Sequence, residues 1–307
     1  MKRGLMIVGA LALAGVAAVW LLVAPHKLPA SAVASVHTPD LANGQVIFTA
    51  GNCAACHMTP GQDDRTKLAG GLKLASPFGV FTTPNISSDK QFGIGSWSEL
   101  QFVNAIKRGI GRHGEQLYPA FPYPSYSLLK TDDVRDLFAY LKTLPASSTP
   151  SGSHQLKFPF NLRPAVGFWK LLFFKPHEFV MDSKKSAAWN RGRYLTEGPA
   201  HCAECHSPRD ALGGLKAGLL YSGAPNLDAG GRFASNITPD KDGIGDWSQQ
   251  DLADFLHTGT DKCFNEPDGM RDVIASTSKL GDADVAAIAT YVHALKPAAG
   301  NGSHKTC

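Results

Sequence analysis

A five-residue motif that occurs twice constrains this chain more than any other feature. The first box is Cys53-Ala54-Ala55-Cys56-His57, and the second box is Cys202-Ala203-Glu204-Cys205-His206. C-x-x-C-H is the attachment pattern of a c-type haem. On one helical turn, two cysteines three residues apart straddle the edge of the macrocycle, and the next side chain points at the iron. The pattern predicts two covalently bound haem c groups, with thioether bonds at Cys53, Cys56, Cys202 and Cys205 and with His57 and His206 as proximal iron ligands.

Other uses of paired cysteines fit less well. A zinc ribbon brings its two C-x-x-C pairs within about 15–20 residues of each other, whereas here the boxes lie in opposite halves of the chain. A thioredoxin-like redox pair needs no adjacent histidine. A chance pair of structural cysteines would not be followed by histidine in both copies. We therefore expect haem attachment at both boxes.

The bulk composition leaves room for two cores and excludes one class of partner. The chain has 307 residues, which is long enough for two ordinary domains. Charged residues make up 18% of the chain, the net charge is +4, and there is no dense run of Lys and Arg. Nucleic acid is therefore not an expected partner. The mild positive charge is typical of a solvated surface and favours steering toward an acidic partner.

The N-terminus predicts export. Lys2 and Arg3 precede an apolar run from Leu5 to Ala24, and this order leaves the N-terminus in the cytoplasm. The run has about 20 residues, enough to span a bilayer, whereas a cleaved signal has an apolar core of about 7–15. We expect an uncleaved transmembrane helix, and the alternative is cleavage after Ala34. Both place the haem-binding part on the periplasmic side of the inner membrane.

Internal repetition divides the chain into five segments. Residues 1–37 are expected to form the membrane anchor and tether, 38–146 the first unit, 147–188 a linker or strap, 189–297 the second unit and 298–307 a C-terminal tail. Each unit carries one box, and the similarity between the units extends well beyond it. A tandem pair of similar domains is therefore predicted.

The units share a pattern around the box. Gly44 and Gly192 stand at matching places in the expected leading helices. A glycine inside a helix costs about 1 kcal/mol, so both are expected to permit close helix packing. The blocks N-I-[ST]-x-D and G-I-G-x-W-S follow the box, starting at Asn85 and at Asn236. These asparagines are expected to form turns, with contact to a haem propionate as the alternative.

Two amphipathic helices are expected at the end of each unit. Capping-box spacing starts the middle helices at Ser96 and at Asp246. The terminal helices have apolar residues at helical spacing within 134–144 and 285–295. No run of alternating strand residues is seen. The predicted fold class is all-α, with two tandem class I cytochrome c domains joined by an irregular strap and preceded by an N-terminal transmembrane helix.

The strap has two apolar stretches, Phe158–Pro164 and Phe168–Phe174. Neither is long enough to span a bilayer. We expect the strap to pack between the two units. The alternative is an exposed patch for a partner subunit or the membrane surface.

The sixth iron ligand has to come from late in each unit, and methionine is usual where a high potential is needed. In the second unit Met270 lies between the middle and terminal helices, so it is the predicted distal ligand. In the first unit the matching residue is Phe121, which cannot ligate iron. The distal ligand of that haem is unknown: the iron is five-coordinate or is bound by one of His113, His154, His177 and Met181.

Two further expectations concern the second ring nitrogen of each proximal histidine and the two cysteines outside the boxes. The other ring nitrogen of each proximal histidine should donate to a backbone carbonyl, and Pro60 and Pro208 are close in sequence. Four cysteines are assigned to haem, which leaves Cys263 and Cys307. Outside the cytoplasm such a pair predicts a disulfide, with two free thiols as the alternative.

These motifs resemble those of a known group of proteins. The group is the membrane-associated multihaem cytochrome c subunits of periplasmic dehydrogenases, of the alcohol, gluconate and molybdenum-hydroxylase types. The shared elements are both boxes, the two blocks after each box, Tyr118-Pro119-Ala120-x-Pro122-Tyr123, Phe158-Pro159-Phe160-Asn161 and the Met270 loop. Many members of the group carry three boxes, whereas this chain has two. The alcohol-dehydrogenase-like members have methionine where Phe121 stands.

The resemblance implies an electron-transfer subunit rather than an enzyme acting on its own. Such a subunit takes electrons from a partner periplasmic dehydrogenase and passes them through two haems to quinone or to a downstream cytochrome or oxidase of a respiratory chain. The alternative is a dihaem cytochrome c peroxidase, which also has two boxes and one haem that opens for peroxide. Phe121 favours that alternative, but no distal acid–base group is evident. A third possibility is a membrane-tethered shuttle without a fixed partner.

Overall fold

The structure is a computed structural model that describes residues 7, 14–15, 18–225, 233–260 and 269–300. Up to residue 146 its elements are η1 (Ala30–Val33), α2 (Leu41–Ala50), α3 (Cys53–His57), β1 (Lys73–Ser76), β2 (Gly79–Thr82), α4 (Glu99–Arg108), α5 (Tyr123–Tyr126) and α6 (Thr131–Thr143). The strap contributes β3 (Gln155–Leu156) and α7 (Pro164–Phe173). The second unit has α8 (Ala187–Glu197), α9 (Ala203–His206), η2 (Ala217–Leu219), β4 (Ala224–Pro225), β5 (Phe233–Ala234), α10 (Gln249–Thr258), α11 (Arg271–Thr277) and α12 (Asp282–His293).

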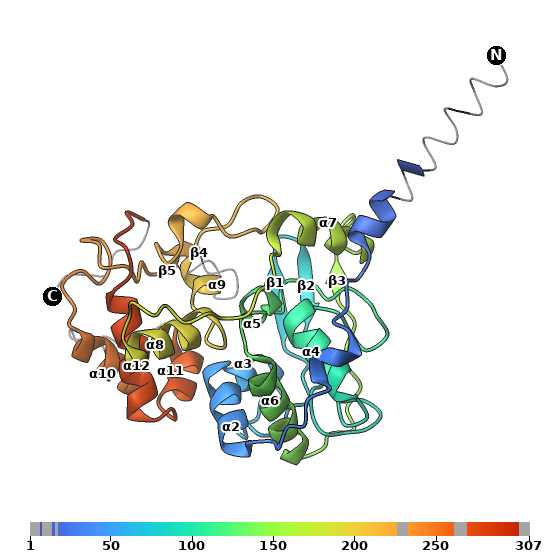
Figure 1. Ribbon diagram of the computed structural model, residues 1–307, viewed down its shortest axis with the longest axis horizontal. Helices are drawn as coiled ribbons and strands as arrows, with labels where there is room; N and C mark the ends of the chain where they lie inside the picture. The colour runs from blue at the N-terminus through green and yellow to red at the C-terminus, as the bar shows by residue number, and fades with distance from the viewer. Residues whose placement is uncertain (1–6, 8–13, 16–17, 226–232, 261–268, 301–307) are drawn as a thin grey trace.

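The same order of helices occurs in both units. A leading helix, a short helix at the box, a middle helix, a short helix and a terminal helix follow each other as α2 to α6 and again as α8 to α12. The leading and terminal helices are packing partners, α2 with α6 and α8 with α12. Figure 1 shows the two sets next to each other, the first in blue to green and the second in yellow to red. One hydrophobic core includes residues of both sets.

Gly44 and Gly192 bring the paired helices into close contact. A Cβ on Gly44 would overlap the backbone carbonyl of Asp136 and lie 2.8 Å from the Cβ of Tyr140. A Cβ on Gly192 would overlap the carbonyl of Ala287 and lie 2.9 Å from the Cβ of Tyr291. The predicted packing role of both glycines is confirmed. In both units, a glycine therefore allows the leading helix to pack closely against the terminal helix.

The middle helices begin slightly later than the sequence predicts. Ser98 and Gln101 form the capping box of α4, and Ser248 and Asp251 form that of α10. Each cap is the serine of the G-I-G-x-W-S block rather than the residue before tryptophan. The capping-box spacing from Ser96 fits equally well in the sequence, so only the backbone distinguishes the two.

Two small sheets correct the all-α prediction. β1 and β2 form an antiparallel hairpin in which Lys73 pairs with Thr82 and Ser76 pairs with Gly79. β3 pairs with β2, and β4 pairs with β5 in the second unit. Recognising a strand by alternation takes about 4–8 residues. These strands are at or below that length, so their pattern is not visible in the sequence.

The predicted N-terminal transmembrane helix is wrong. Among the described residues, no helix is both long and apolar enough to cross a membrane. Val23 is buried, and its carbonyl accepts a hydrogen bond from Gln116 Nε2 at 3.0 Å. This end of the segment packs on the protein itself.

The strap touches both units. Lys170 on α7 donates from Nζ to the carbonyls of Arg108 and Gly109 at the end of α4, at 2.6 and 2.9 Å. Trp169 donates from Nε1 to the carbonyl of Leu212 in the second unit at 3.0 Å. The exposed apolar side chains of α7 are Phe168, Leu171 and Leu172. One face of α7 therefore joins the units, and the other face is open to solvent.

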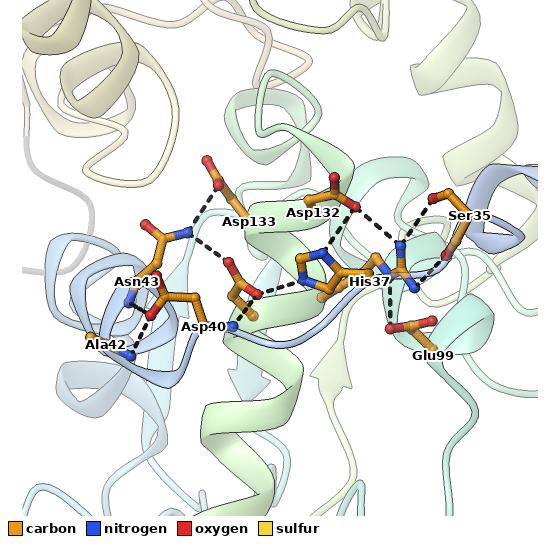
Figure 2. Close-up of polar contacts among 10 residues, drawn as sticks. Ser35, His37, Asp40, Ala42, Asn43, Glu99, Asp132 and Asp133 are labelled. Carbon is orange, nitrogen blue, oxygen red and sulfur yellow. Dashed lines mark hydrogen bonds and ion pairs between the residues drawn. The ribbon is translucent and has the colours of Figure 1, made fainter.

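A polar network fixes the chain where it enters the first leading helix (Figure 2). His37 Nε2 lies 2.6 Å from Asp136 Oδ1, and the amide of Asp40 donates to the same oxygen at 2.8 Å. Asn43 donates to Asp133 and Asp136 at 2.9 and 2.8 Å. Burial raises the pKa of Asp136, but these hydrogen bonds outweigh it and hold the pKa below its usual range. The start of α2 is therefore tied to α6 by a buried carboxylate.

We predict that Gly44→Ala and Gly192→Ala each destabilise the protein. The added methyl group has to push two backbones apart, and overpacking of this kind costs about 1–3 kcal/mol, occasionally more. Gly218→Ala is the control, because nothing lies within 4 Å of a Cβ at that position. Denaturant unfolding of the three variants measures the effect. Equal stability of Gly44→Ala, Gly192→Ala and the control would contradict the packing role.

Candidate functional site

Both boxes begin after a residue with left-handed backbone. Asn52 precedes the first box with a φ of 47°, and His201 precedes the second with a φ of 38°. Asparagine and histidine enter this region more often than most residues, yet the conformation still costs about 1–3 kcal/mol. Because both units have this conformation directly before the box, we infer that the entry to each box requires it.

The first thiol of each box lies in a desolvated setting. Burial and the neighbouring Cys56 raise the pKa of Cys53 to about 12, against smaller opposing effects of its own amide and Arg65. Burial and the neighbouring Cys205 raise the pKa of Cys202 to about 12. Disulfide exchange requires a thiolate. The raised values therefore disfavour a thioredoxin-like role for these pairs.

Both proximal histidines are oriented by a backbone carbonyl. His57 Nδ1 lies 2.8 Å from the carbonyl oxygen of Pro84, and His206 Nδ1 lies 2.7 Å from that of Ser235. A carbonyl only accepts, so Nδ1 carries the proton and Nε2 holds the lone pair that binds a metal. Burial lowers the pKa of His57, against the opposing effect of the Pro84 carbonyl. The expectation of a backbone carbonyl is confirmed, but Pro60 and Pro208 are the wrong residues.

Asn85 and Asn236 organise the loop between the box and the middle helix. Asn85 donates to two backbone carbonyls that follow α6, at 2.8 Å each, and accepts from the amide of Ser87 at 2.9 Å. Asn236 donates to the carbonyl of Ala298 and accepts from the amide of Thr238, both at 2.8 Å. Both side chains are buried. The turn-forming expectation is confirmed, because their amide groups are satisfied by backbone.

An aromatic cluster occupies the first unit where a distal methionine would be expected. Phe121 packs against the ring of Tyr126, with centroids 5.4 Å apart and planes at 62°. Tyr126 is buried, its Oη lies 3.5 Å from the carbonyl of Gly51, and burial raises its pKa. Phe121 is therefore a packing residue beside the first box.

His154 has the wrong tautomer for an iron ligand. Its Nδ1 accepts a hydrogen bond from the amide of Thr82 at 3.1 Å, so the ring proton of the neutral form is on Nε2. Burial, helped by Arg163, lowers its pKa and favours that neutral form. The other candidates for the distal position are exposed, namely His113, His177 and Met181. Nothing in the described geometry selects a distal ligand for the first unit.

Met270 stands where the sequence places it, between the middle and terminal helices of the second unit. It is the N-cap residue of α11 and is half-buried. The predicted disulfide pair, Cys263 and Cys307, lies outside the described residues.

Sequence analysis missed the residues that bring the boxes together. The ring of His201, directly before the second box, packs against the ring of Tyr126, with centroids 5.6 Å apart and planes at 71°. Burial lowers the pKa of His201, against opposing effects that include Glu204 and the carbonyl of Gly51. The alignment of His201 with Asn52 in the repeat is the one signal that could have identified it.

Comparison with known proteins identifies the family. The model of the family described as Cytochrome c matches residues 41–145. A protein named diheme cytochrome c-type, from Cereibacter sphaeroides, is 40% identical over 91% of this chain and 93% of its own length. The chain belongs to the cytochrome c family. Covalently bound haem c is the cofactor of this cytochrome.

Two further relatives are named as parts of dehydrogenases. The fructose dehydrogenase cytochrome subunit of Gluconobacter japonicus is 40% identical over 88% of this chain and 55% of its own length. The gluconate 2-dehydrogenase cytochrome c subunit of Pantoea cypripedii is 36% identical over 82% of this chain and 58% of its own length. The chain thus spans little more than half of these two relatives. The predicted resemblance to cytochrome subunits of dehydrogenases is confirmed, and electron transfer is consistent with it.

The described residues fit a haem. Each box lies on a helical turn, and each proximal histidine directs its lone pair through Nε2. In the part of the chain that the structure describes, four buried polar atoms have no hydrogen-bond partner: Arg108 Nε, Tyr123 Oη, Trp189 Nε1 and Thr196 Oγ1. Buried polar groups are almost always satisfied by a partner.

We predict that Asn85→Ala destabilises the first unit and leaves the visible spectrum unchanged. The substitution leaves two carbonyls and the amide of Ser87 without their partner, which costs about 1–3 kcal/mol for a buried group. Asn161→Ala is the control, because Asn161 is exposed. Thermal unfolding and the spectra of both redox states measure the two effects. A shifted haem spectrum at unchanged stability would contradict the turn-forming role.

Proposed function

We propose that this cytochrome is a dihaem electron-transfer subunit. One haem c is bound by Cys53 and Cys56 in a first unit of residues 38–146. The other is bound by Cys202 and Cys205 in a second unit of residues 189–297, and the strap of residues 147–188 joins the units. The matching Nδ1–carbonyl contacts of His57 and His206 carry this proposal, because they give both histidines the tautomer of an iron ligand.

The side chains have positioning roles. When bound, haem c supplies a one-electron carrier whose potential depends on its axial ligands and burial. His57 and His206 bind the iron from the proximal side, and the carbonyls of Pro84 and Ser235 hold their rings. Met270 provides the distal ligand in the second unit. The apolar core packs around both sites, with Cys53 and Ala54 of the first box among its residues and neighbours.

The partner is a periplasmic dehydrogenase, and the acceptor is quinone or a downstream cytochrome or oxidase of the respiratory chain. The names of the relatives support the first part, because two of them are cytochrome subunits of sugar or sugar-acid dehydrogenases. The attachment of c-type haem outside the cytoplasm supports a location on the periplasmic side of the inner membrane. Co-purification with a dehydrogenase, and reduction of both haems by its substrate, tests this assignment.

A dihaem peroxidase is the second candidate function, because Phe121 cannot bind iron. A non-ligating side chain at that position is compatible with an open iron in the first unit. The carbon monoxide difference spectrum of the fully reduced protein separates the candidates. Binding at neither haem removes the main support for a peroxidase, whereas binding at half of the haem requires an assay of peroxide turnover.

We predict that removing either pair of box cysteines halves the covalently bound haem. The variants are Cys53→Ala with Cys56→Ala, and Cys202→Ala with Cys205→Ala. Cys263→Ala is the control for loss of a cysteine outside the boxes, and it should keep the full haem content. The pyridine haemochrome absorbance per polypeptide measures the stoichiometry. Full haem content in either double variant would show that the corresponding box does not attach haem.

We predict that Met270→Ala lowers the midpoint potential of one haem and opens its iron to carbon monoxide. A thioether ligand stabilises ferrous haem, so its loss lowers the potential. Met181→Ala is the matched control, because this exposed methionine should have no effect on either haem. Potentiometric titration and the carbon monoxide difference spectrum provide the two readouts. If Met270→Ala matches the wild type in both, Met270 is not the distal ligand.

A further inference from the structure

Three polar residues connect the first box to the second unit. Arg65 lies in the loop after the first box and donates from one terminal nitrogen to Asn52 Oδ1 at 2.8 Å and to Ser276 Oγ at 2.7 Å. The hydroxyl of Ser276, on α11, donates to Asn52 Oδ1 at 2.7 Å. Ser276 is buried. The three side chains therefore form a closed ring of hydrogen bonds, here named the Arg65 cluster.

The second box has a matching contact with the first unit. Ser125 on α5 donates to Glu204 Oε1, within the second box, at 3.3 Å. Ser125 and Ser276 hold equivalent places in the repeat, since each lies four residues before the leucine that precedes the terminal helix, Leu129 or Leu280. Each unit thus uses the same short helix to contact the other unit, at Glu204 within the second box and at Asn52 directly before the first box. A hydrogen bond from the other unit therefore lies at or beside each box.

The Arg65 cluster acts on Asn52, the residue directly before the first box. Asn52 has the left-handed backbone that precedes Cys53, and its side chain accepts both hydrogen bonds. Strained conformations persist only where the surrounding structure fixes them. The cluster supplies that restraint from both units at once. The position of Cys53, and of any group bonded to it, therefore depends on Arg65 and Ser276.

Arg65 also places a positive charge beside the first box. Its charge opposes the rise in the pKa of Cys53, so it acts electrostatically at that sulfur. A nearby cation favours whichever redox state carries more negative charge. At a haem bonded to Cys53 this is the reduced state. The charge of Arg65 therefore raises the reduction potential at the first box.

We propose that Arg65 is a positioning residue for electron passage between the two haem units. It fixes the first box against the second unit through Asn52 and Ser276, and its cation raises the potential of the haem held there. The inference rests on the proposed function, since it assumes one haem at each box. To that function it adds a role for Arg65, which sets the geometry of the two haems and the difference between their potentials.

Three variants of the full-length protein test the proposal. Arg65→Gln removes the charge and weakens the cluster. Lys67→Gln removes a charge of the same sign two residues away, where the side chain is half-exposed and pairs with Asp64 at 3.7 Å. Ser276→Ala keeps the charge of Arg65 and removes the cross-unit hydrogen bonds. Potentiometric titration reports both potentials, and flash reduction reports the rate of electron exchange between the haems.

The expected result is a fall in the potential of one haem in Arg65→Gln, clearly larger than in Lys67→Gln, with the other haem unchanged. Ser276→Ala should retain both potentials and slow the exchange between haems. Equal potentials in Arg65→Gln and Lys67→Gln, or an unchanged exchange rate in Ser276→Ala, would overturn the proposal. If Arg65→Gln does not fold, Ser276→Ala decides the positioning role of the cluster, on which the proposal depends. A wild type with fewer than two haems would refute the proposed function instead, and haem content establishes this first.

Discussion

The close approach of a leading helix to a terminal helix is the contact on which both units depend. At Gly44 and at Gly192 the backbone of one helix touches a carbonyl of the other, which leaves no room for a side chain. This contact fixes the end of the leading helix, and the box follows within a few residues. The proximal histidine is then aimed by a carbonyl from the loop ahead of the middle helix. Helix packing and this carbonyl together orient the histidine of each box, which is the proposed iron ligand.

Duplication explains why the site is built from pairs of equivalent residues. Asn52 and His201 share a left-handed backbone, and Asn85 and Asn236 share a buried turn. One divergence between the copies lies where the units meet. Asn52 binds Arg65 and Ser276, whereas the ring of His201 packs on Tyr126. The residues that precede the two boxes therefore make different contacts where the units meet.

The sequence predicted those features of the site that depend only on residues close together in the chain. The boxes, the helix-packing glycines and the place of Met270 follow from residue types a few positions apart. The carbonyls of Pro84 and Ser235 were missed because any residue supplies a carbonyl, so only the folded backbone identifies the acceptor. The short strands were not predicted because two to four residues are too few to show an alternation of apolar and polar side chains. The N-terminal transmembrane helix was predicted from apolar length alone, without the packing of Val23 on the protein.

The central claim is that the two boxes hold haems that exchange electrons within one molecule. Flash reduction with less than one electron per protein, followed at wavelengths that distinguish the haems, tests it most directly. The account predicts a phase in which one haem loses its electron to the other at a rate independent of protein concentration. Exchange that occurs only between molecules, with a rate proportional to protein concentration, would contradict it.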